Sequence, residues 1–487
     1  SLPLRRRIVT GLTAFAVTAG ALTGCWKLAF RLDQLSTVFS NLAFAYEDFG
    51  FSYCFLQTWL NKGIRQPANY SAQDMERIRA ETETAGDASS DAPQTDVNVL
   101  YVQLESFMDP AEIKGLELSK DALPFWHELE QQFSSGYLTV PVVGAGTANT
   151  EFEVLTGMSS RMFGPGEYPY KTCLQNHTVE SVAYDLSALG YATHAIHNHR
   201  ATFYTRNLVY ANLGFDDFTS LEYMPLVSKT PKGWSRDYIL TSQIIKALDA
   251  TADQPDLVFT VSVQGHGSYP KEEILSNPAI TVTGCPKHIN SHSMEYYVNQ
   301  IHEMDQFVKR LTDALSQRQE KTVLVLYGDH LPSLNLKAGD MNSGSLFKTR
   351  YIIWNNFGLE QEDQDLYAYQ LSASVLGSLD ITDGFMNRFH QLCQKQLTYR
   401  TDLRKIQYDV LYGSRYLYGG ESPYPPTDMK MGCVPIRITK VYQHNGAWYI
   451  EGQNFSPYCE VTLDGKLLKT EYICETMLKL KEAPNTL

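Results

Sequence analysis

The sequence predicts an α/β fold with a mostly parallel central sheet flanked by helices. Five apolar runs of strand length, residues 97–104, 191–197, 257–263, 322–327 and 351–354, alternate with helical patterns. Such alternation is typical of strands joined by crossover helices. Polar residues directly follow these runs, and open α/β sheets bind their ligands at the carboxyl ends of strands. We therefore expect one sheet with a ligand site at that edge.

Composition limits the class of partner. The chain has 487 residues and a net charge of −13, which argues against a nucleic-acid partner because such proteins need a basic face. An enzyme with this charge that acts on an anionic lipid would need its positive charge concentrated in a site. Eight cysteines occur without a CxxC pair, which excludes a zinc finger.

The N-terminal residues predict a membrane anchor. Arg5, Arg6 and Arg7 precede an uncharged run over residues 8–26, about long enough to span a bilayer. The arginines predict a cytoplasmic N-terminal flank and an extracellular remainder. We expect a transmembrane helix over residues 1–30, the last of a truncated membrane domain, in a cell-membrane protein; a signal peptide and a buried helix are the alternatives.

The rest of the chain divides into three predicted segments. Residues 31–95 are expected to form a juxtamembrane helical segment and an acidic linker, the linker beginning at residue 80. Within this segment, residues 48–60 are aromatic and amphipathic, typical of a helix on a membrane surface or one covering the globular domain. Residues 96–430 are expected to form the catalytic domain, and residues 431–487 a small β-rich module.

The C-terminal module is predicted from turn residues. Residues 436–442 and 447–450 flank Asn445-Gly446, which indicates a tight hairpin, and residues 461–466 suggest a second. The segment around residues 454–456 resembles small immunoglobulin-like (IPT/TIG-type) modules, although it is short for a sandwich. It would bind a wall glycan or a neighbouring domain, or be a passive appendage. Cys433, Cys459 and Cys474 would permit one disulfide if this part is extracellular.

A glycine-rich stretch over residues 144–153 carries the candidate nucleophile. It follows the strand-like run 136–143 and precedes a helical pattern. Thr147 is its first nucleophilic residue, at an expected helix start where free N–H groups favour an anion such as phosphate. A threonine hydroxyl needs a base or a metal to become nucleophilic. The alternative is that Thr147 is only a helix N-cap.

Four residues at expected strand ends form the metal hypothesis. They are Glu105, Thr147, Asp329 and His330. Three oxygen ligands and one imidazole suit a divalent ion such as Mn²⁺, with Mg²⁺ or Zn²⁺ as alternatives. The ion would favour deprotonation of the Thr147 hydroxyl.

Five ordered motifs also resemble a known family. They are Leu-Glu-Ser-Phe at 104–107, Gly-Thr-Ala-Asn-Thr-Glu-Phe at 146–152, Phe-Tyr-Thr-Arg at 203–206 with Gly-Phe-Asp-Asp-Phe at 214–218, Ser-Val-Gln-Gly-His at 262–266, and Tyr-Gly-Asp-His at 327–330. Over roughly residues 40 to 420 the chain resembles the lipoteichoic acid synthases. These are membrane phosphoglycerol transferases of the sulfatase/alkaline-phosphatase superfamily.

The resemblance implies roles for particular residues. Mn²⁺ would be bound by the four residues already named, and Thr147 would be the nucleophile. The glycerol phosphate group would contact His197, Tyr204, Arg206 and His266, with Arg206 gripping phosphate bidentately. The family commonly has tryptophan where this chain has Tyr204, so the headgroup stays open.

The implied reaction is a headgroup transfer. Phosphatidylglycerol would be the donor, a glycolipid or teichoic-acid-type glycan the acceptor, and a glycerophosphoryl-threonine the intermediate. A true sulfatase would need a Cys or Ser in a C/S-x-P-x-R motif, which residues 147–151 lack. A phosphatase or phosphodiesterase would transfer to water, and a surface binding or sensor protein on an inactive scaffold is the non-enzyme alternative.

Overall fold

The computed structural model describes the chain except for residues 1–2, 32–38, 40–41, 85–91 and 482–487. Residues 85–91 of the acidic linker predicted over residues 80–95 therefore lie outside the described residues. The chain forms two compact units. The first comprises residues 1–63 and 163–167, and the second comprises residues 64–162 and 168–487.

The first unit is helical. It contains α1 (Leu4–Arg31), α2 (Leu42–Phe49) and α3 (Phe51–Leu60). Within α1, Arg5–Cys25 is long and apolar enough to cross a membrane. A small cluster of Phe39, Ala45, Tyr53 and Cys54 holds α2 and α3 together.

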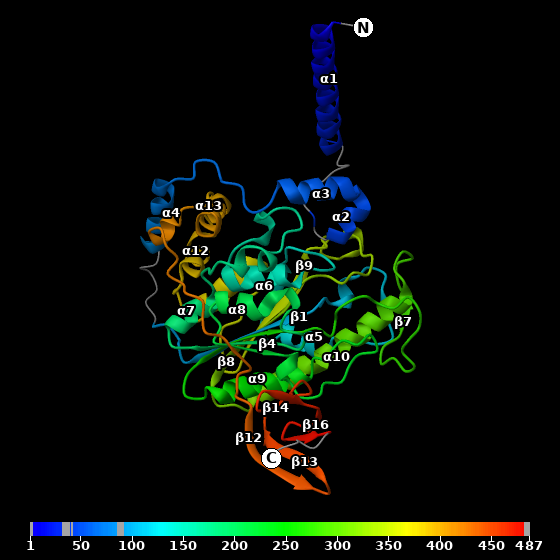
Figure 1. Ribbon diagram of the computed structural model, residues 1–487, viewed down its shortest axis with the longest axis vertical. Coiled ribbons are helices and arrows are strands. Elements are labelled where there is room, and N and C mark those ends of the chain that lie inside the picture. The colour runs from blue at the N-terminus through cyan, green and yellow to red at the C-terminus, as the bar shows by residue number, and fades with distance from the viewer. Residues whose placement is uncertain (1–2, 32–38, 40–41, 85–91, 482–487) are drawn as a thin grey trace. The chain divides into compact units, whose positions relative to one another are not determined.

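The second unit is built on a nine-stranded sheet (Figure 1). Its strand order is β10-β3-β9-β8-β1-β6-β4-β5-β11. The strands are β1 (Val97–Leu104), β3 (Ser134–Thr139), β4 (Ala192–His197), β5 (Asp217–Ser220), β6 (Asp256–Val261), β8 (Lys321–Gly328), β9 (Lys348–Asn355), β10 (Leu366–Tyr367) and β11 (Lys430–Met431). A separate two-stranded sheet pairs β2 (Glu117–Leu118) with β7 (Val282–Gly284).

The central strands confirm the predicted mostly parallel sheet. β1 pairs in parallel with both β6 and β8, and all eight of its residues are buried, as expected of a continuous apolar run covered on both faces. β9 differs, because it runs antiparallel to both β3 and β8. Asn355, which follows the fifth apolar run, therefore lies at the opposite edge of the sheet from the carboxyl ends of the parallel strands.

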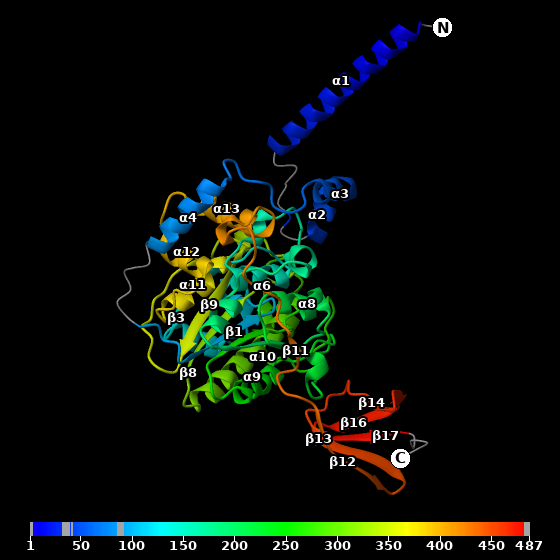
Figure 2. The same ribbon diagram turned by 60° about the vertical axis from the view of Figure 1, so that its left-hand side comes forward.

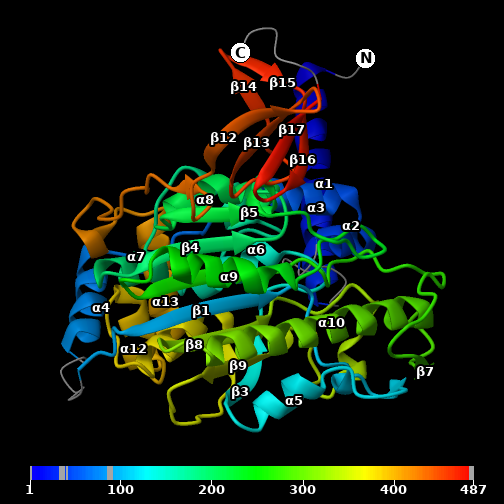
Figure 3. The same cartoon turned by 90° about the horizontal axis from the view of Figure 1, so that it is seen from below.

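Helices cover both faces of this sheet (Figures 2 and 3). α9 (Ile239–Ala250) and α10 (Ser291–Ser316) lie on one face, and their apolar sides join the main core cluster. On the other face lie α6 (Thr147–Thr156), α11 (Leu371–Gly377), α12 (Phe385–Cys393) and α13 (Tyr399–Leu411). The remaining helices of this unit are α4 (Ala72–Thr84), α5 (Pro124–Glu130), α7 (Val182–Ala188) and α8 (Arg206–Asn212).

Helix α4 belongs to the second unit. Arg77 donates to Asp402 at 2.8 Å, and Lys405 donates to Asp74 at 2.6 Å, so ion pairs join α4 to α13. The linker was predicted to begin at residue 80, whereas α4 continues to Thr84 and buries Thr82. The polar composition misled the prediction because the buried side of this helix is narrow.

The C-terminal strands form the two predicted hairpins. β12 (Arg437–His444) and β13 (Ala447–Gln453) pair around Asn445 and Gly446, whose φ angles of 47° and 77° fit a tight turn. β14 (Val461–Leu463) and β15 (Lys466–Leu468) form the second hairpin, and β16 (Thr470–Cys474) and β17 (Met477–Leu480) complete the four-stranded sheet. Cys433, Cys459 and Cys474 are free thiols.

Candidate active site

The strand register brings two acidic residues together. Leu104 at the end of β1 pairs with Gly328 at the end of β8, so the next residues, Glu105 and Asp329, emerge side by side. The Oγ of Ser262, just past β6, accepts a hydrogen bond of 2.9 Å from the Glu105 amide. The backbone pairing itself therefore positions these carboxylates at the predicted edge.

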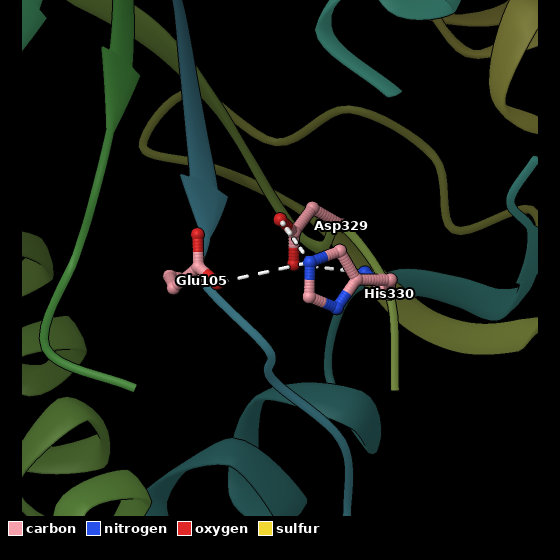
Figure 4. Close-up of side chains that lie close together, drawn as sticks. All are labelled: Glu105, Asp329 and His330. Atoms are coloured by element: carbon pink, nitrogen blue, oxygen red, sulfur yellow. Dashed lines mark hydrogen bonds and ion pairs between the residues drawn. The ribbon is translucent and has the colours of Figure 1, made fainter. Parts of the chain in front are cut away.

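Glu105, Asp329 and His330 form a buried cluster (Figure 4). One ligand atom from each lies within 4.8 Å of the others. His330 Nε2 lies 3.3 Å from Asp329 Oδ2 and 3.7 Å from Glu105 Oε1. Two carboxylates and one imidazole therefore share a small volume that is closed to solvent.

Hydrogen bonding prepares this cluster for a cation. His330 Nδ1 lies 3.0 Å from the Leu331 carbonyl oxygen, so Nδ1 carries the proton and Nε2 presents a lone pair to the carboxylates. Burial lowers the pKa of His330, whereas burial and the Glu105 charge raise the pKa of Asp329 well above its usual range. Among the described residues, neither His330 Nε2 nor Asp329 Oδ2 has a hydrogen-bond partner. The cluster therefore fits a divalent ion held by Glu105, Asp329 and His330.

Thr147 points its hydroxyl at this cluster. It is the first residue of α6, and its Oγ1 donates a 3.0 Å hydrogen bond to Glu105 Oε2. The N-cap is Gly146, which makes no side-chain cap. The interpretation of Thr147 as only a cap is therefore wrong, and the structure places a threonine hydroxyl at a helix start beside a candidate metal site.

Two glycines let backbone segments pack closely around the candidate site. Gly146 has φ of 105°, and a Cβ there would lie 3.1 Å from the Val142 side chain, so only glycine fits the turn that presents Thr147. Gly265 lies against the Glu105 carbonyl, where a Cβ would lie 2.1 Å from that oxygen. The loop carrying His266 therefore packs directly against the backbone at the end of β1.

Arg206 is placed differently from the predicted phosphate grip. It is 1% exposed, and its Nε and Nη2 donate to the two carboxylate oxygens of Glu151 on α6. Its Nη1 donates to the Phe203 carbonyl oxygen at 3.2 Å. The bidentate edge of the guanidinium is thus used by Glu151, a residue to which sequence reasoning assigned no role.

Tyr204 sits on a strained turn. Tyr204 and Thr205 have consecutive φ angles of 57° and 56°, a conformation that non-glycine residues seldom adopt and that concentrates at functional sites. The Tyr204 ring centroid lies 5.3 Å from the Arg206 guanidinium carbon. The turn therefore holds the tyrosine over the arginine.

His197 and His266, which were predicted to contact the glycerol phosphate group, lie in one cluster of aromatic rings. His197 is buried at the end of β4, and its Nδ1 lies 2.8 Å from the Val261 carbonyl oxygen. Burial, and then the Arg206 charge, lower the pKa of His197 well below its usual range, so it is neutral. The His266 ring centroid is 4.3 Å from that of Trp234, which in turn lies 5.7 Å from His199.

Trp234 and His199 were not assigned functions from the sequence. Burial, followed by the Arg206 charge, lowers the pKa of His199 to about 4, so it is also a neutral imidazole near pH 7. Trp234 is half-buried on a loop that belongs to none of the five motifs, so only its aromatic character was available as a signal.

Comparison with known proteins decides the family. Residues 97–390, more than half of the chain, match the family described as Sulfatase. The chain belongs to the sulfatase family. This confirms the predicted superfamily and its α/β fold, and the match contains Glu105, Thr147, Asp329 and His330.

Two relatives of this chain carry different descriptions. The chain is 34% identical over 291 residues to a Rhizobium meliloti (strain 1021) protein named for cyclic beta-1,2-glucan modification, covering 60% of this chain and 44% of that protein. It is 26% identical over 242 residues to the capsular polysaccharide biosynthesis protein RkpI of the same organism, covering 48% of this chain and 41% of that protein. The chain thus spans less than half the length of these relatives.

A solved structure has the same fold. The Streptococcus pyogenes phosphoglycerol transferase GacH, in complex with sn-glycerol-1-phosphate, superposes with a TM-score of 0.66 at 21% identity. The alignment covers 73% of this chain and 97% of that one. The metal-ligand and substrate roles of individual residues stay predictions.

Proposed function

We propose that this sulfatase-family chain is a metal-dependent phosphoglycerol transferase. It moves glycerol phosphate from phosphatidylglycerol to a hydroxyl of a cell-surface glycan through a covalent Thr147 intermediate. The observation that carries the proposal is the Thr147 hydroxyl, hydrogen-bonded at 3.0 Å to Glu105 within the buried Glu105, Asp329 and His330 cluster. Mn²⁺ is the proposed ion.

The chemistry consists of two displacements at phosphorus. Thr147 Oγ1 attacks the phosphodiester while its proton moves along the hydrogen bond toward Glu105 Oε2, and the bond from phosphorus to the diacylglycerol oxygen breaks. The departing oxygen takes a proton from solvent and leaves as diacylglycerol. The acceptor hydroxyl then attacks phosphorus and releases its proton to solvent, while the bond from phosphorus to Thr147 Oγ1 breaks. The proton held by Glu105 returns to Thr147 Oγ1 and restores the hydroxyl. A bound divalent ion supplies charge stabilisation for the phosphoryl oxygens.

Other residues of the site position the headgroup. The free N–H groups at the start of α6 favour the phosphate charge. The neutral imidazoles of His197 and His199 suit hydroxyl groups of glycerol better than a second anion, because neither carries a charge near pH 7. Arg206 forms a buried ion pair with Glu151, so it adds little net positive charge at the site.

A glucan is the favoured acceptor. The relative that shares 34% identity is named for modification of cyclic beta-1,2-glucan, and this supports a glucan rather than a lipoteichoic acid chain as the group that receives glycerol phosphate. Attachment of a charged headgroup to a neutral glucan needs only one acceptor hydroxyl, which matches the proposed second displacement.

A membrane location suits a lipid donor. Arg5–Cys25 of α1 is apolar enough to span a bilayer. In the first unit, α3 exposes one face of large apolar residues, Phe51, Phe55, Leu56, Trp59 and Leu60. Apolar and aromatic side chains on one helix face fit the interface between lipid and water. We propose that the catalytic unit acts on the extracellular side.

The test is diacylglycerol release from phosphatidylglycerol vesicles by the full chain with Mn²⁺. Thr147→Ala should abolish release, whereas the surface control Thr462→Ala should not change it. Mass spectrometry of added cyclic β-1,2-glucan should show one glycerol phosphate per modified hydroxyl, whereas transfer to water would yield free glycerol phosphate. Absence of release by a folded, Mn²⁺-bound protein would refute the proposal.

A further inference from the structure

A cavity lies away from the candidate metal site of Glu105, Asp329 and His330. It has a volume of about 270 Å³ and is lined by residues of the β3–α6 loop, α6, the segment after α6, β10 and α13. Three of its lining residues are arginines, Arg161, Arg400 and Arg404. The cavity is therefore basic in a chain whose net charge is −13.

The first arginine is held in place. Arg161 Nη2 donates to the Val140 carbonyl oxygen at 2.9 Å, and its Nε donates to Pro141 O at 3.3 Å. Its guanidinium carbon lies 4.2 Å from the Phe347 ring centroid. A guanidinium fixed by two carbonyls and a ring keeps its direction without a carboxylate partner.

The other two arginines have no counter-charge. Arg400 and Arg404 are four residues apart on α13, so they share one helix face, and no carboxylate of the described residues forms an ion pair with either of them. The Arg400 charge also adds to burial in lowering the pKa of Arg161. All three arginine side chains reach solvent, so their mutual repulsion is screened, and an anion in the cavity would be attracted by three cations at once.

The single acid of the cavity does not neutralise it. Glu153 is 2% exposed, and its Oε1 accepts hydrogen bonds from the Ser160 amide at 2.8 Å and from the Ser159 hydroxyl at 3.1 Å. Burial raises the pKa of Glu153 to about 7. Near neutral pH this carboxyl is therefore only partly ionised, and the cavity remains positive.

Two tyrosines add a different kind of surface. Tyr367 and Tyr369 line the cavity, and their rings are stacked with centroids 5.1 Å apart and planes inclined by 13°. Flat aromatic surface beside unpaired guanidinium groups suits a ligand that joins an apolar ring face to an anion. A sugar ring that carries a phosphate ester has both features.

We propose that the Arg161, Arg400 and Arg404 cavity binds the phosphate group of a phosphate-substituted saccharide. The identity of this ligand rests on the proposed function, in which the glycan product carries glycerol phosphate. Glu153 and Thr147 share α6 and are six residues apart, which corresponds to ~9 Å along the helix axis. The cavity would therefore hold a substituted part of the glycan while another hydroxyl reaches Thr147.

The experiment is calorimetric titration of the full chain with glucose 6-phosphate in EDTA. EDTA removes the metal site from the measurement, so failure of the transferase proposal, read as no diacylglycerol release, is separate from failure of this one. We expect binding that is at least tenfold weaker in the Arg400→Gln/Arg404→Gln variant. The Lys395→Gln/Lys466→Gln variant removes the same charge elsewhere and should bind as the wild type does.

A second variant distinguishes recognition of the sugar ring from recognition of the phosphate group. Tyr367→Ala should weaken binding of glucose 6-phosphate but leave inorganic phosphate unchanged. Undetectable binding in EDTA, or equal binding by the double arginine variant with an unchanged melting temperature, would overturn the proposal. So would a higher KM for phosphatidylglycerol vesicles together with unchanged transfer to glucan, because the cavity would then serve the lipid.

Discussion

The buried ion pair between Arg206 and Glu151 gives the sharpest prediction for the site. Glu151 is 0% exposed and accepts hydrogen bonds from Arg206 and from the Tyr210 hydroxyl, the latter at 2.9 Å. Glu151→Gln keeps the shape of the side chain but leaves the Arg206 charge unpaired in the interior. Breaking a buried pair in this way costs about 3–5 kcal/mol of unfolding free energy.

The cost should appear as a large fall in melting temperature. For a domain of this size each kcal/mol corresponds to a shift of about 2 °C, so Glu151→Gln should melt about 6–10 °C below the wild type. Scanning calorimetry of the full chain in EDTA measures this shift without any contribution from bound metal. Glu272→Gln, on an exposed loop, is the control and should change stability by less than about 0.5 kcal/mol.

A double variant tests the cause. Arg206→Met removes the charge that Glu151→Gln leaves unpaired, so the two changes together should restore much of the lost stability. A melting temperature for Glu151→Gln within 2 °C of the wild type would refute the reasoning. It would mean that Arg206 is not committed to Glu151 and is available to grip phosphate, as the sequence predicted.

Three further predictions concern the metal, pH and the glycine turn. Mn²⁺ at one hundred times its Kd should add about 2.7 kcal/mol to the unfolding free energy, and Asp329→Asn should abolish this gain in calorimetry. Burial alone would lower the pKa of His194, but hydrogen bonds to Asp217 and Asp256 outweigh it and raise this pKa to about 9. The resulting stability is therefore complete below about pH 6.5 and lost as pH rises through about 9, a slope that His194→Gln should remove from urea-denaturation series. Gly146→Ala should cost about 1–3 kcal/mol and most of the diacylglycerol release, whereas Gly339→Ala, which has open space around its Cβ, should change neither.

The sequence was sufficient to predict the central strands and to bring Glu105, Asp329 and His330 to one edge of the sheet. The runs before Glu105 and Asp329 are apolar without interruption, and such runs are typical of parallel strands buried on both faces. Carboxyl ends of neighbouring parallel strands meet at one edge, so the two acids could be placed together from order alone. The structure adds the register, Leu104 opposite Gly328, which makes them adjacent.

Strand direction could not be predicted in the same way. The run ending at Asn355 has the same apolar pattern as its neighbours, since burial on both faces removes any alternation that would distinguish antiparallel pairing. In the structure Asn355 Oδ1 accepts hydrogen bonds from the Gly358 and Leu359 amides. Its side chain therefore stabilises a turn far from the metal cluster.

Helix α6 shows why the Arg206 pairing was missed. All ten of its residues, Thr147–Thr156, are buried although six of them are polar or charged. Helical amphipathicity indicates which face is buried only when one face meets solvent, so it cannot indicate where Glu151 points. The partner, Arg206, is 55 positions away, and no local rule joins the two.

The same helix connects the two proposed sites. Its first residue presents the Thr147 hydroxyl to the metal cluster, and Glu153 lines the arginine cavity, so a fully buried helix fixes the spacing between them. A chain with a net charge of −13 repels anionic ligands at long range. Binding of a phosphate-bearing lipid or glycan therefore has to rely on local positive charge. The proposed divalent ion and the N-terminus of α6 would supply it at one site, and Arg161, Arg400 and Arg404 supply it at the other. Because Arg206 is neutralised by Glu151 while the cavity arginines are unpaired, the cavity should account for most of the salt dependence of glycan transfer.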